Sequence, residues 1–462
     1  MRSIALFFWL LLLTLLGGVG PGRAQDILWA RTYGGDHQDW APAVEQTTDG
    51  GFIIAGCSDV PGGRNWDVTL LKTDLWGDTL WARTYDGGGS EWASCVRQTE
   101  DGGYILGVSD GLGDLLRVDE TGEPIWSRDY PLIGMTARET KDGGFVVGGL
   151  QDGHAALLKT DPDGAEVWSH RYPALEWSEI HSLYEAEGGG FVLGGSAYSG
   201  LTAWDYYVVR TRPDGEVLWA RTYGLRGFPD EGWAICPAPH GGSVLTGLYF
   251  GTLGLSADGD SLWLHYYGSG EISCAYSIDP THDEGFVLGG IVDPGGIDDG
   301  DYLVARIDER GTAFWERSYG AGAGSFDNGQ CIRQTDDHAY VMVGWSDAFG
   351  GGDMDVWLLR IDAELSATET RPTRAGDRGL RLPNPVTGGV PALLSYWMAE
   401  AGRAELEIYG PQGRMIYAAS RTHARGGRYH MEWNPRGTSP GVYLIRLRGG
   451  ADEQSGRLVL LR

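Results

Sequence analysis

The sequence lacks the motifs on which the common metal and cofactor sites depend. It holds only five cysteines among 462 residues, and no group of cysteines and histidines has the spacing of a metal site. It has no glycine-rich phosphate loop, and its ten histidines are scattered. Because five is an odd number, at least one thiol is unpaired within the chain, and we interpret the cysteines as small, buried hydrophobic residues. The sequence therefore offers no catalytic constellation and requires no cofactor.

Long apolar runs are also missing, except at the start of the chain. Arg2 precedes an apolar run over residues 4–16, which is too short to anchor a protein in a bilayer, and small and turn residues follow up to Ala24. This pattern predicts a secretory signal peptide over residues 1–24. We expect a mature protein without a membrane span that passes through the periplasm and is secreted or held at the outer cell surface.

The balance of charge is strongly acidic and uneven. The formal net charge is −27, which argues against nucleic acid as a partner because its phosphates would be repelled. Residues 380–462 carry 11 Arg, no Lys and only 6 acidic residues, so the excess negative charge lies before them. The change of sign predicts a domain boundary, with a Thr-, Arg- and Gly-rich linker over residues 366–379 and a separate domain over residues 380–462.

Glycine and aromatic residues are abundant, with 75 Gly, 19 Trp and 22 Tyr. This composition suits many short strands connected by tight turns. A Trp-x-x-x-Tyr segment recurs seven times at spacings of 42 to 52 residues, which is the period of a β-propeller blade. Its tryptophans are Trp29, Trp81, Trp126, Trp168, Trp219, Trp263 and Trp315. We expect each Trp and Tyr to pack between neighbouring blades, because a residue present in every blade serves what all blades share.

Each period contains four apolar or alternating segments with glycine-containing turns between them. The two ends of the repeat are complementary. Residues 29–33 form a fourth strand with no first three before it, and residues 331–335, 340–345 and 355–362 form three strands with no fourth after them. The sequence therefore predicts an all-β fold, a seven-bladed β-propeller over residues 26–365 with 3+1 strand closure, which removes an open edge. We expect a monomer.

The connections within and between blades divide between two faces. Asp-Gly-Gly and Asp-x-x-Gly turns on one face hardly vary, whereas the loops on the other face vary in length. Binding residues concentrate on variable loops that a rigid scaffold holds, so this variable-loop face is the candidate ligand-binding face. The candidates on it are Trp66, Trp204, Tyr198 and Tyr249, with Asn65 and Phe250 beside them, and Trp40, Trp92 and Trp177.

The last three tryptophans belong to a recurring acid–aromatic pair, seen at Asp39-Trp40, Glu91-Trp92 and Glu176-Trp177. Tryptophan beside a carboxylate suits a glycan, because the indole stacks on the sugar ring and the carboxylate accepts hydroxyl hydrogen bonds. The structural alternative is that the acid caps backbone N–H groups of the crossover while the aromatic residue packs between blades. Since the pair recurs across blades, we favour the structural interpretation.

Two Asp-rich loops, residues 293–301 and 353–355, offer the oxygen ligands that Ca²⁺ binds. Neither loop has the Ca²⁺-loop spacing that ends in a Glu, and Asp and Gly are ordinary turn residues. We therefore expect no metal and no other cofactor, with Ca²⁺ as the alternative.

The repeat resembles a known family. The segment Asp161-Pro162-Asp163-Gly164-Ala165-Glu166-Val167-Trp168 resembles the tryptophan-docking repeats of quinoprotein-like (PQQ-like) propellers, and the resemblance covers residues 26–365. It implies the fold alone, since none of that family's cofactor or metal ligands can be matched in this sequence.

The tail contains Leu382-Pro383-Asn384-Pro385, a second segment over residues 406–414, and Gly441-Val442-Tyr443 before a terminal apolar strand. These segments resemble the C-terminal (Por) sorting domain of type IX secretion substrates and the related Ig-like domain of flagellar hook-capping proteins. The resemblance implies a small Ig-like β-sandwich and recognition by the secretion machinery. The sorting-motif residues would be Pro383, Asn384, Pro385, Gly413, Gly441 and Tyr443. Leu382 stands where Tyr is usual and Gly410 where Asp is usual, so a purely structural Ig-like module is the alternative.

These features favour a noncatalytic secreted or cell-surface propeller that binds a glycan or a protein on its variable-loop face and is exported through its C-terminal sorting domain. A first alternative is an extracellular glycan-active hydrolase or lyase that uses acids such as Asp39, Glu91 or Asp299. It requires two nonrepeating carboxylates roughly 5–10 Å apart with raised pKa values. A second alternative is a purely structural envelope or matrix component.

Overall fold

The computed structural model divides the chain into two compact units, residues 1–367 and residues 368–462. In the first unit it describes residues 20–21, 27–59, 65–109, 112–172, 176–199, 203–224, 229–268, 272–293, 300–321, 324–350 and 353–363. In the second unit it describes residues 386–387, 392–398, 402–410, 414–423, 427–436, 438, 441–449 and 452–461.

The described part of the first unit contains seven sheets with antiparallel blade strands. Six of them follow the chain. They are β3 (Asp39–Gln46), β4 (Phe52–Asp59), β5 (Trp66–Thr73) and β6 (Thr79–Tyr85); β7 (Ala93–Gln98), β8 (Tyr104–Val108), β9 (Leu115–Val118) and β10 (Pro124–Arg128); β11 (Ile133–Glu139), β12 (Phe145–Gln151), β13 (His154–Thr160) and β14 (Glu166–Tyr172); β15 (Trp177–Glu185), β16 (Phe191–Ser199), β17 (Ala203–Thr211) and β18 (Val217–Tyr223); β19 (Gly232–Pro237), β20 (Ser243–Gly247), β21 (Gly251–Leu255) and β22 (Ser261–Tyr266); β23 (Ile272–Pro280), β24 (Phe286–Asp293), β25 (Asp301–Ile307) and β26 (Ala313–Tyr319). A single-turn 3₁₀ helix, Pro239–Gly241, connects β19 to β20.

The remaining sheet joins the two ends of the unit. It consists of β27 (Asp327–Gln334), β28 (Tyr340–Ser346), β29 (Asp355–Ile361) and β2 (Ile27–Tyr33), in the order β2-β29-β28-β27. β2 runs antiparallel to β29, with Ile27 opposite Ile361 and Tyr33 opposite Val356. The expected pairing of the N-terminal strand with three strands almost 300 residues later is therefore observed.

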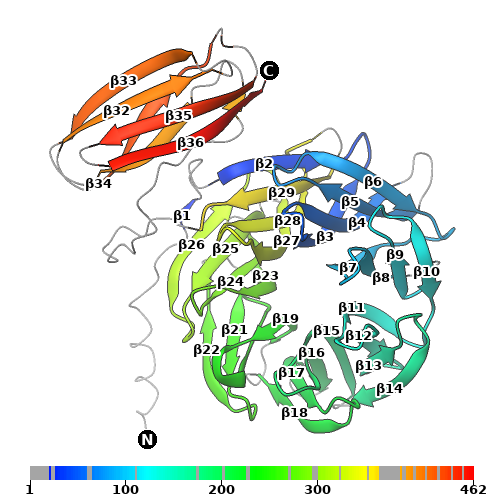
Figure 1. Ribbon diagram of the computed structural model, residues 1–462. Helices are drawn as coiled ribbons and strands as arrows, with labels where there is room; N and C mark the ends of the chain where they lie inside the picture. The colour runs from blue at the N-terminus through cyan, green and yellow to red at the C-terminus, as the bar shows by residue number, and fades with distance from the viewer. Residues whose placement is uncertain are drawn as a thin grey trace, which may run out of the picture. The chain divides into compact units, whose positions relative to one another are not determined.

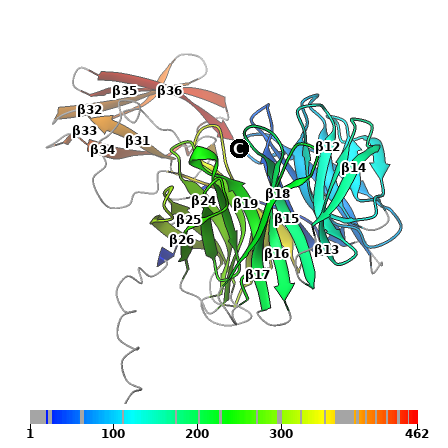
Figure 2. The same ribbon diagram turned by 90° about the horizontal axis from the view of Figure 1, so that it is seen from below.

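The sheets stand around a common centre. Figure 1 shows the first strand of each sheet innermost and the fourth strand outermost, and Figure 2 shows the same sheets in a view turned by 90°. Neighbouring innermost strands contact each other in chain order, and β27 contacts β3, so the contacts close on themselves. The unit is a β-propeller, and the described chain is all-β, as predicted.

Burial follows position within a sheet. Every residue of β8 and β29 is buried, which explains their unbroken apolar sequences, because a middle strand packs against neighbouring sheets on both faces. Outermost strands such as β14 have exposed and partly buried residues in alternation.

The recurring Trp and Tyr residues join neighbouring sheets. Trp29 meets Phe52 of the next sheet edge-on, with ring centroids 5.9 Å apart, and Trp81 meets Tyr104 in the same way at 6.0 Å. The hydroxyls of six of the seven recurring tyrosines donate to the carbonyl of the glycine in the turn between the third and fourth strands of the next sheet. These pairs are Tyr33–Gly77, Tyr85–Gly122, Tyr130–Gly164, Tyr172–Gly215, Tyr223–Gly259 and Tyr267–Gly311. The prediction that these residues pack between blades is confirmed.

The seventh recurring tyrosine differs for a topological reason. Tyr319 precedes the closing sheet, whose third and fourth strands come from opposite ends of the chain, so no turn joins them. Tyr319 instead belongs to a core cluster with Tyr340 and Trp357. The exception is a consequence of the closure.

The aspartates of the Asp-Gly-Gly turns have a defined partner. Lys72 Nζ lies 2.8 Å from Asp49, and Lys159 Nζ lies 3.0 Å from Asp142, and both lysines are buried in third strands. Arginines take the same place beside Asp101, Asp283 and Asp337. Although burial alone would raise it, hydrogen bonds from Thr140 and Lys159 lower the pKa of Asp142 to about 2. These turns therefore anchor to the sheet that they connect.

The described part of the second unit contains seven further strands. They are β30 (Val386–Thr387), β31 (Ala392–Met398), β32 (Gly402–Tyr409), β33 (Met415–His423), β34 (Gly427–Trp433), β35 (Gly441–Gly449) and β36 (Asp452–Leu461). They form one sheet of order β30-β36-β35-β32-β33 and a pair β31-β34. Leu394, Tyr396 and Trp433 of the pair share a buried core with Leu406 and Ile445 of the larger sheet.

No helix in the described part of the chain has the length and apolar character needed to cross a membrane. The predicted signal peptide lies outside the described residues except for β1 (Gly20–Pro21), which pairs in parallel with β26. The predicted linker, residues 366–379, also lies outside them.

Candidate functional site

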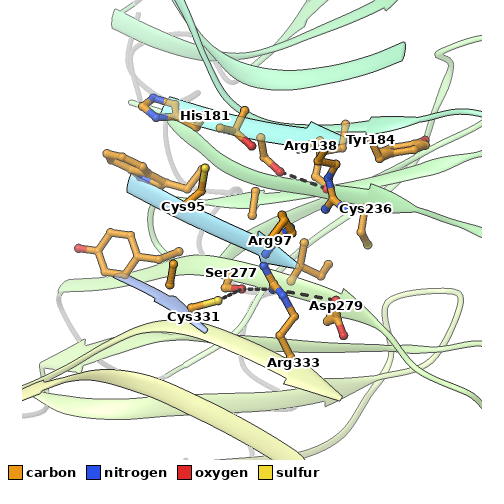
Figure 3. A pocket seen from close by; sticks show the side chains of 18 of the residues that line it. Cys95, Arg97, Arg138, His181, Tyr184, Cys236, Ser277, Asp279, Cys331 and Arg333 are labelled. Atoms are coloured by element: carbon orange, nitrogen blue, oxygen red, sulfur yellow. Dashed lines mark hydrogen bonds and ion pairs between the residues drawn. The ribbon is translucent and has the colours of Figure 1, made fainter. Parts of the chain in front are cut away.

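A cavity of about 460 Å³ lies where the innermost strands of the seven sheets meet (Figure 3). Each of these strands contributes lining residues, from Pro42 on β3 to Arg333 on β27. The cavity is the central channel of the propeller, and it gathers side chains that lie almost 300 residues apart in sequence.

A recurring β-bulge shapes the channel. In all seven innermost strands the register against the second strand slips by one residue. In six of them a single residue is left unpaired, and in β3 the slip spans Ala41 and Pro42. A bulge bends a strand and re-aims a side chain. The extra residues at the six single bulges are Ser94, Met135, His181, Trp233, Tyr276 and Gln330, and all of them line the cavity. The bulge recurs but its residue differs in every sheet, so these side chains are not selected by a shared packing role.

The next residue along each innermost strand is small. In chain order these residues are Ala43, Cys95, Thr136, Ser182, Ala234, Ser277 and Cys331, and all line the cavity. Several of them tie adjacent strands together, since Ser182 Oγ donates to Ile235 O at 3.3 Å and Cys331 Sγ donates to Val44 O at 3.7 Å. All five cysteines are buried and free of disulfides, so the interpretation of the cysteines as small buried residues is confirmed.

Three arginines project into the cavity two residues further along: Arg97 from β7, Arg138 from β11 and Arg333 from β27 (Figure 3). Arg333 is 3.9 Å from Asp279, and Arg97 is 3.9 Å from Glu45, so both ion pairs are loose. This group of five charged side chains is called the arginine layer below. These five side chains sum to one positive charge. Two further acids line the cavity but have other partners, since Glu139 accepts from Glu100 N at 2.8 Å and Glu185 lies 3.2 Å from Lys141 Nζ.

Arg138 differs from the other two arginines of the layer. Its Nε donates to Leu183 O at 2.9 Å, but no carboxylate of the described residues lies within ion-pair distance of its guanidinium. Burial, together with the positive charges of Arg97 and Arg333, lowers the pKa of Arg138 to about 9. Its positive charge is thus the least compensated in the channel.

An aromatic and acidic cluster lies toward the start of the innermost strands, which is the end nearer the variable-loop face. The His181 ring is 4.4 Å from Trp233, and Trp233 is 5.6 Å from Tyr276. His181 Nε2 is 2.9 Å from Glu179 Oε1. The cluster comes from β15, β19 and β23, three consecutive sheets.

Two carboxylates of this cluster are shifted in opposite directions. Burial, followed by the negative charge of Glu179, raises the pKa of Glu231. Burial would also raise the pKa of Glu179, but the hydrogen bond from His181 and its positive charge lower it overall. Glu179 and Glu231 occupy the same register position of adjacent sheets, seven residues before Ala186 and Ala238, and no other sheet has an acid there.

In the predicted acid–aromatic pairs, the acids and the tryptophans have different surroundings. Asp39 Oδ2 accepts from Gly35 N at 3.2 Å, and Glu91 Oε1 accepts from Gly89 N at 2.5 Å, so both acids cap the crossover backbone as the structural interpretation expects. The tryptophans of these pairs are not all buried. Trp92 is 40% exposed and Trp177 is 41% exposed, which is unusual for the largest apolar side chain.

The predicted loop residues lie apart from the channel lining. Trp66 begins β5, and its carbonyl accepts from Glu91 N at 2.7 Å. Tyr198 and Trp204 lie opposite each other on β16 and β17, with ring centroids 5.5 Å apart. Tyr249 is 39% exposed at a positive φ of 55°, whereas its neighbour Phe250 is fully buried in a core cluster.

Some predicted residues fall outside the described ones. Asp299 and most of the Asp-rich loop 293–301 are among them, as are Pro383, Asn384, Pro385 and Gly413 of the sorting motif. Gly441 begins β35, and Tyr443 of the same strand is buried against Trp433 with ring centroids 5.7 Å apart. In the second Asp-rich loop Asp355 is buried, while Asp353 is exposed.

The arginine layer and the Glu179–His181–Trp233–Tyr276 cluster were missed from the sequence. The signal was available for the arginines, because Arg97, Arg138 and Arg333 each stand two residues before a recurring threonine. A Gly-x-Ser-x-Gly string over residues 107–111 has no catalytic setting, since the Ser109 hydroxyl donates to Trp92 O at 3.3 Å and no helix follows among the described residues.

Comparisons with known proteins show the fold alone. No protein-family model and no curated protein matches the sequence. Raptor from Chaetomium thermophilum matches with 12% identity and a TM-score of 0.52, over 75% of this chain and 30% of its own. PorZ, an essential surface component of the type IX secretion system of Porphyromonas gingivalis, matches with 13% identity and a TM-score of 0.45, over 97% of this chain and 61% of its own. This chain thus spans less than two thirds of either protein.

Proposed function

We propose that this protein is an exported, noncatalytic propeller that binds a glycan at the channel mouth on its variable-loop face. The observation that carries the proposal is that Trp92 and Trp177, both about 40% exposed, stand at the start of the innermost strands β7 and β15, the end toward which His181, Trp233 and Tyr276 also lie. Exposed indole faces stack on sugar rings, and the neighbouring carboxylates and imidazole supply hydrogen-bonding groups for hydroxyls.

The scaffold in this proposal is a seven-bladed propeller with 3+1 closure. The seven described sheets, the closed series of contacts between innermost strands and the pairing of β2 with β29 support that count. A closed ring fixes the positions of the crossover loops relative to one another. Rigid placement of several aromatic residues reduces the entropy lost when a ligand binds.

Export is the second part of the proposal. The apolar run over residues 4–16 would direct the chain to the periplasm, and the second unit would act as an Ig-like sorting domain read by the type IX machinery. The two-sheet arrangement of β30–β36 around one core supports an Ig-like sandwich. If the signal peptide is cleaved near Ala24, the mature protein lacks β1 but retains β2.

Glycan-array screening of the full mature chain tests the binding proposal. The wild type should retain specific glycans, and the double variant Trp92→Ala/Trp177→Ala should lose them. Leu80→Ala is the matched control, since Leu80 is 57% exposed on an outermost strand away from the channel. A wild type that binds no glycan but captures a protein, or a double variant that binds like the control, would contradict the proposal.

The Glu179–Glu231 pair favours one second candidate, a glycan-active hydrolase. Environments that push two neighbouring carboxylates to opposite pKa shifts are typical of a general acid and its ionised partner. Glu231 with the raised pKa would be the acid, and Glu179 with the lowered pKa would be the base or nucleophile. Hydrolysis of an array-selected oligosaccharide that Glu231→Gln abolishes while binding persists would favour this candidate. Binding without hydrolysis would favour the noncatalytic proposal.

A further inference from the structure

The arginine layer has the composition of an anion site. Arg97, Arg138 and Arg333 enter one cavity from three different sheets, and the two acids that form ion pairs with them, Glu45 and Asp279, also accept hydrogen bonds from backbone N–H groups. Glu45 accepts from Gln98 N at 2.5 Å, and Asp279 accepts from Gln334 N at 3.0 Å. Each acid therefore neutralises an arginine only from 3.9 Å away. Arg97 Nη1 donates to Val96 O at 3.0 Å, and Arg333 Nη1 donates to Ser277 Oγ at 2.9 Å and to Ile332 O at 2.7 Å, so the anion would accept from the remaining N–H groups of each guanidinium.

Like charges that share a low-dielectric space repel each other, and an arginine stays protonated under ordinary conditions. Arg138 bears most of this repulsion, because it has no carboxylate partner among the described residues and its pKa is lowered by burial, Arg97 and Arg333. A small anion would relieve the repulsion and accept the free N–H groups of the guanidinium fork. A cavity of about 460 Å³ has room for such an anion and several waters, at ~30 Å³ per water.

We propose that the channel binds a small oxyanion, a phosphate, sulfate or carboxylate group, between Arg97, Arg138 and Arg333. This site is separate from the proposed glycan site, because it uses the last part of the innermost strands rather than the Trp-rich start. The anion arrives either free or as the acidic substituent of a larger ligand.

Calorimetric titration of the full mature chain with orthophosphate, sulfate and glucuronate, at constant ionic strength in chloride, tests the proposal. At least one of them should bind with a Kd below about 1 mM, a level at which binding is readily measured. Tight binding of phosphate or sulfate identifies a free inorganic anion, and tight binding of glucuronate identifies a sugar acid. Arg138→Gln should weaken the binding by about tenfold or more, whereas Arg310→Gln, a surface change at an 83% exposed side chain, should not.

Thermal unfolding distinguishes loss of the anion site from misfolding of the variant. Without an anion, Arg138→Gln should have a Tm equal to or above that of the wild type, because it removes a repelling charge. With phosphate the wild type should become the more stable protein. Absence of binding by all three anions, or equal binding by both variants, would overturn the proposal.

A separate observation points to a cation site at the first sheet junction. At several junctions an acid of the crossover lies beside the aspartate that begins a third strand, as Asp39 lies beside Asp355 and Asp327 beside Asp301. The residue after the recurring Tyr is then a glycine, because a side chain there would collide with these carboxylates, as at Gly34 and Gly320. After Tyr130 and Tyr172 a proline takes the place of the glycine, and after Tyr85 Asp86 takes it, which adds a further carboxylate.

This substitution produces a group of three carboxylates. Oxygens of Asp67, Asp86 and Glu91 lie within 4.8 Å of one another. Glu91 is fully buried, and its Oε2 has no hydrogen-bond partner among the described residues. No Lys or Arg of the described chain forms an ion pair with any of the three. A buried, unpartnered carboxylate is costly unless a cation or a proton neutralises it.

We infer that Asp67, Asp86 and Glu91 bind a divalent cation, with Ca²⁺ favoured by the all-oxygen ligands. The test is the Tm of chelator-treated mature protein with and without about 10 mM CaCl₂, above the weakest extracellular Ca²⁺ sites. Ca²⁺ should raise the wild-type Tm and leave that of Asp86→Gly unchanged. That variant introduces the residue found at four of the other six junctions and should fold. Asp129→Asn, at an exposed position, should keep the effect. A wild type insensitive to Ca²⁺, or an Asp86→Gly variant that still responds, would overturn the inference.

Discussion

At the scale of single residues, the molecule repeats a small number of contacts and varies the side chains between them. The Trp-x-x-x-Tyr segments were predictable because the same pair of contacts, Trp on the next sheet and Tyr on the next glycine carbonyl, recurs at junction after junction. The lining of the channel was not predictable in the same way. A bulge re-aims His181, Trp233 and Tyr276 into the channel, and alternation along a strand gives no sign of that extra residue.

The tyrosine contact gives a prediction for stability. Tyr172 is buried, and its hydroxyl donates to Gly215 O at 2.8 Å, so Tyr172→Phe leaves a carbonyl without its partner. We expect the free energy of unfolding to fall by about 1–3 kcal/mol, measured by urea denaturation. Tyr249→Phe is the control, because Tyr249 is 39% exposed, and it should change stability by no more than about 0.5 kcal/mol. Equal stability of Tyr172→Phe and the wild type would show that the junction does not depend on this bond.

At the scale of strands and sheets, the closing strand is the element on which the ring depends. Its existence could be predicted because an orphan fourth strand at one end of the repeat complements three strands at the other. The bulges and the third-strand aspartates could not be predicted. A bulge is a change of a single residue in a strand, and the partner of such an aspartate lies on another sheet. Asp355, for example, meets Asp39 across the closing junction only after the ring has formed.

Deleting Ile27–Tyr33 should open the ring. The change removes the whole of β2 and exposes the edge of β29, whose carbonyl and N–H groups then lack a neighbour. We expect a lower Tm and concentration-dependent aggregation, measured by calorimetry and light scattering. A synthetic peptide of residues 27–33 should restore part of the Tm by adding a strand to that edge, while a scrambled peptide should not. An unchanged unfolding transition would contradict the role given to β2.

At the scale of the whole molecule, two groups of carboxylates with shifted pKa values predict the dependence of stability on pH. Burial raises the pKa of Asp39, Asp327 and Glu231 above the ordinary carboxyl value, so the folded state takes up protons more readily than the unfolded state. These groups add stability as pH falls from their raised pKa values toward about 4. Aspartates such as Asp142, with a pKa of about 2, act oppositely, and their stabilisation is lost as pH falls from about 4 toward 2.

The expected outcome is a maximum of Tm at mildly acidic pH. Calorimetry at constant ionic strength should show Tm rising as pH falls from 7 toward about 5 and decreasing below about 4. Asp39→Asn/Asp327→Asn should flatten the rise without changing the decrease. A Tm that increases steadily from pH 4 to 7 would show that the lowered pKa values outweigh the raised ones at every pH.

The division into two units gives a prediction about export. Removing residues 380–462 takes away the strands of the second unit and leaves every strand of the propeller in place. The truncated protein should therefore unfold with the propeller's own transition but accumulate in the periplasm, as cell fractionation would show. Secretion equal to that of the full chain would remove the sorting role from the tail.

The most direct test of the proposed function is the affinity for a glycan selected on the array. Titration calorimetry should give a Kd for the full mature chain, and Trp92→Ala/Trp177→Ala should raise this Kd by about tenfold or more. Each stacked indole should contribute ~1–3 kcal/mol to binding, by analogy with bases that stack on aromatic side chains. Leu80→Ala should bind like the wild type. Equal Kd values for the double variant and the wild type would show that the exposed tryptophans at the channel mouth do not form the binding site.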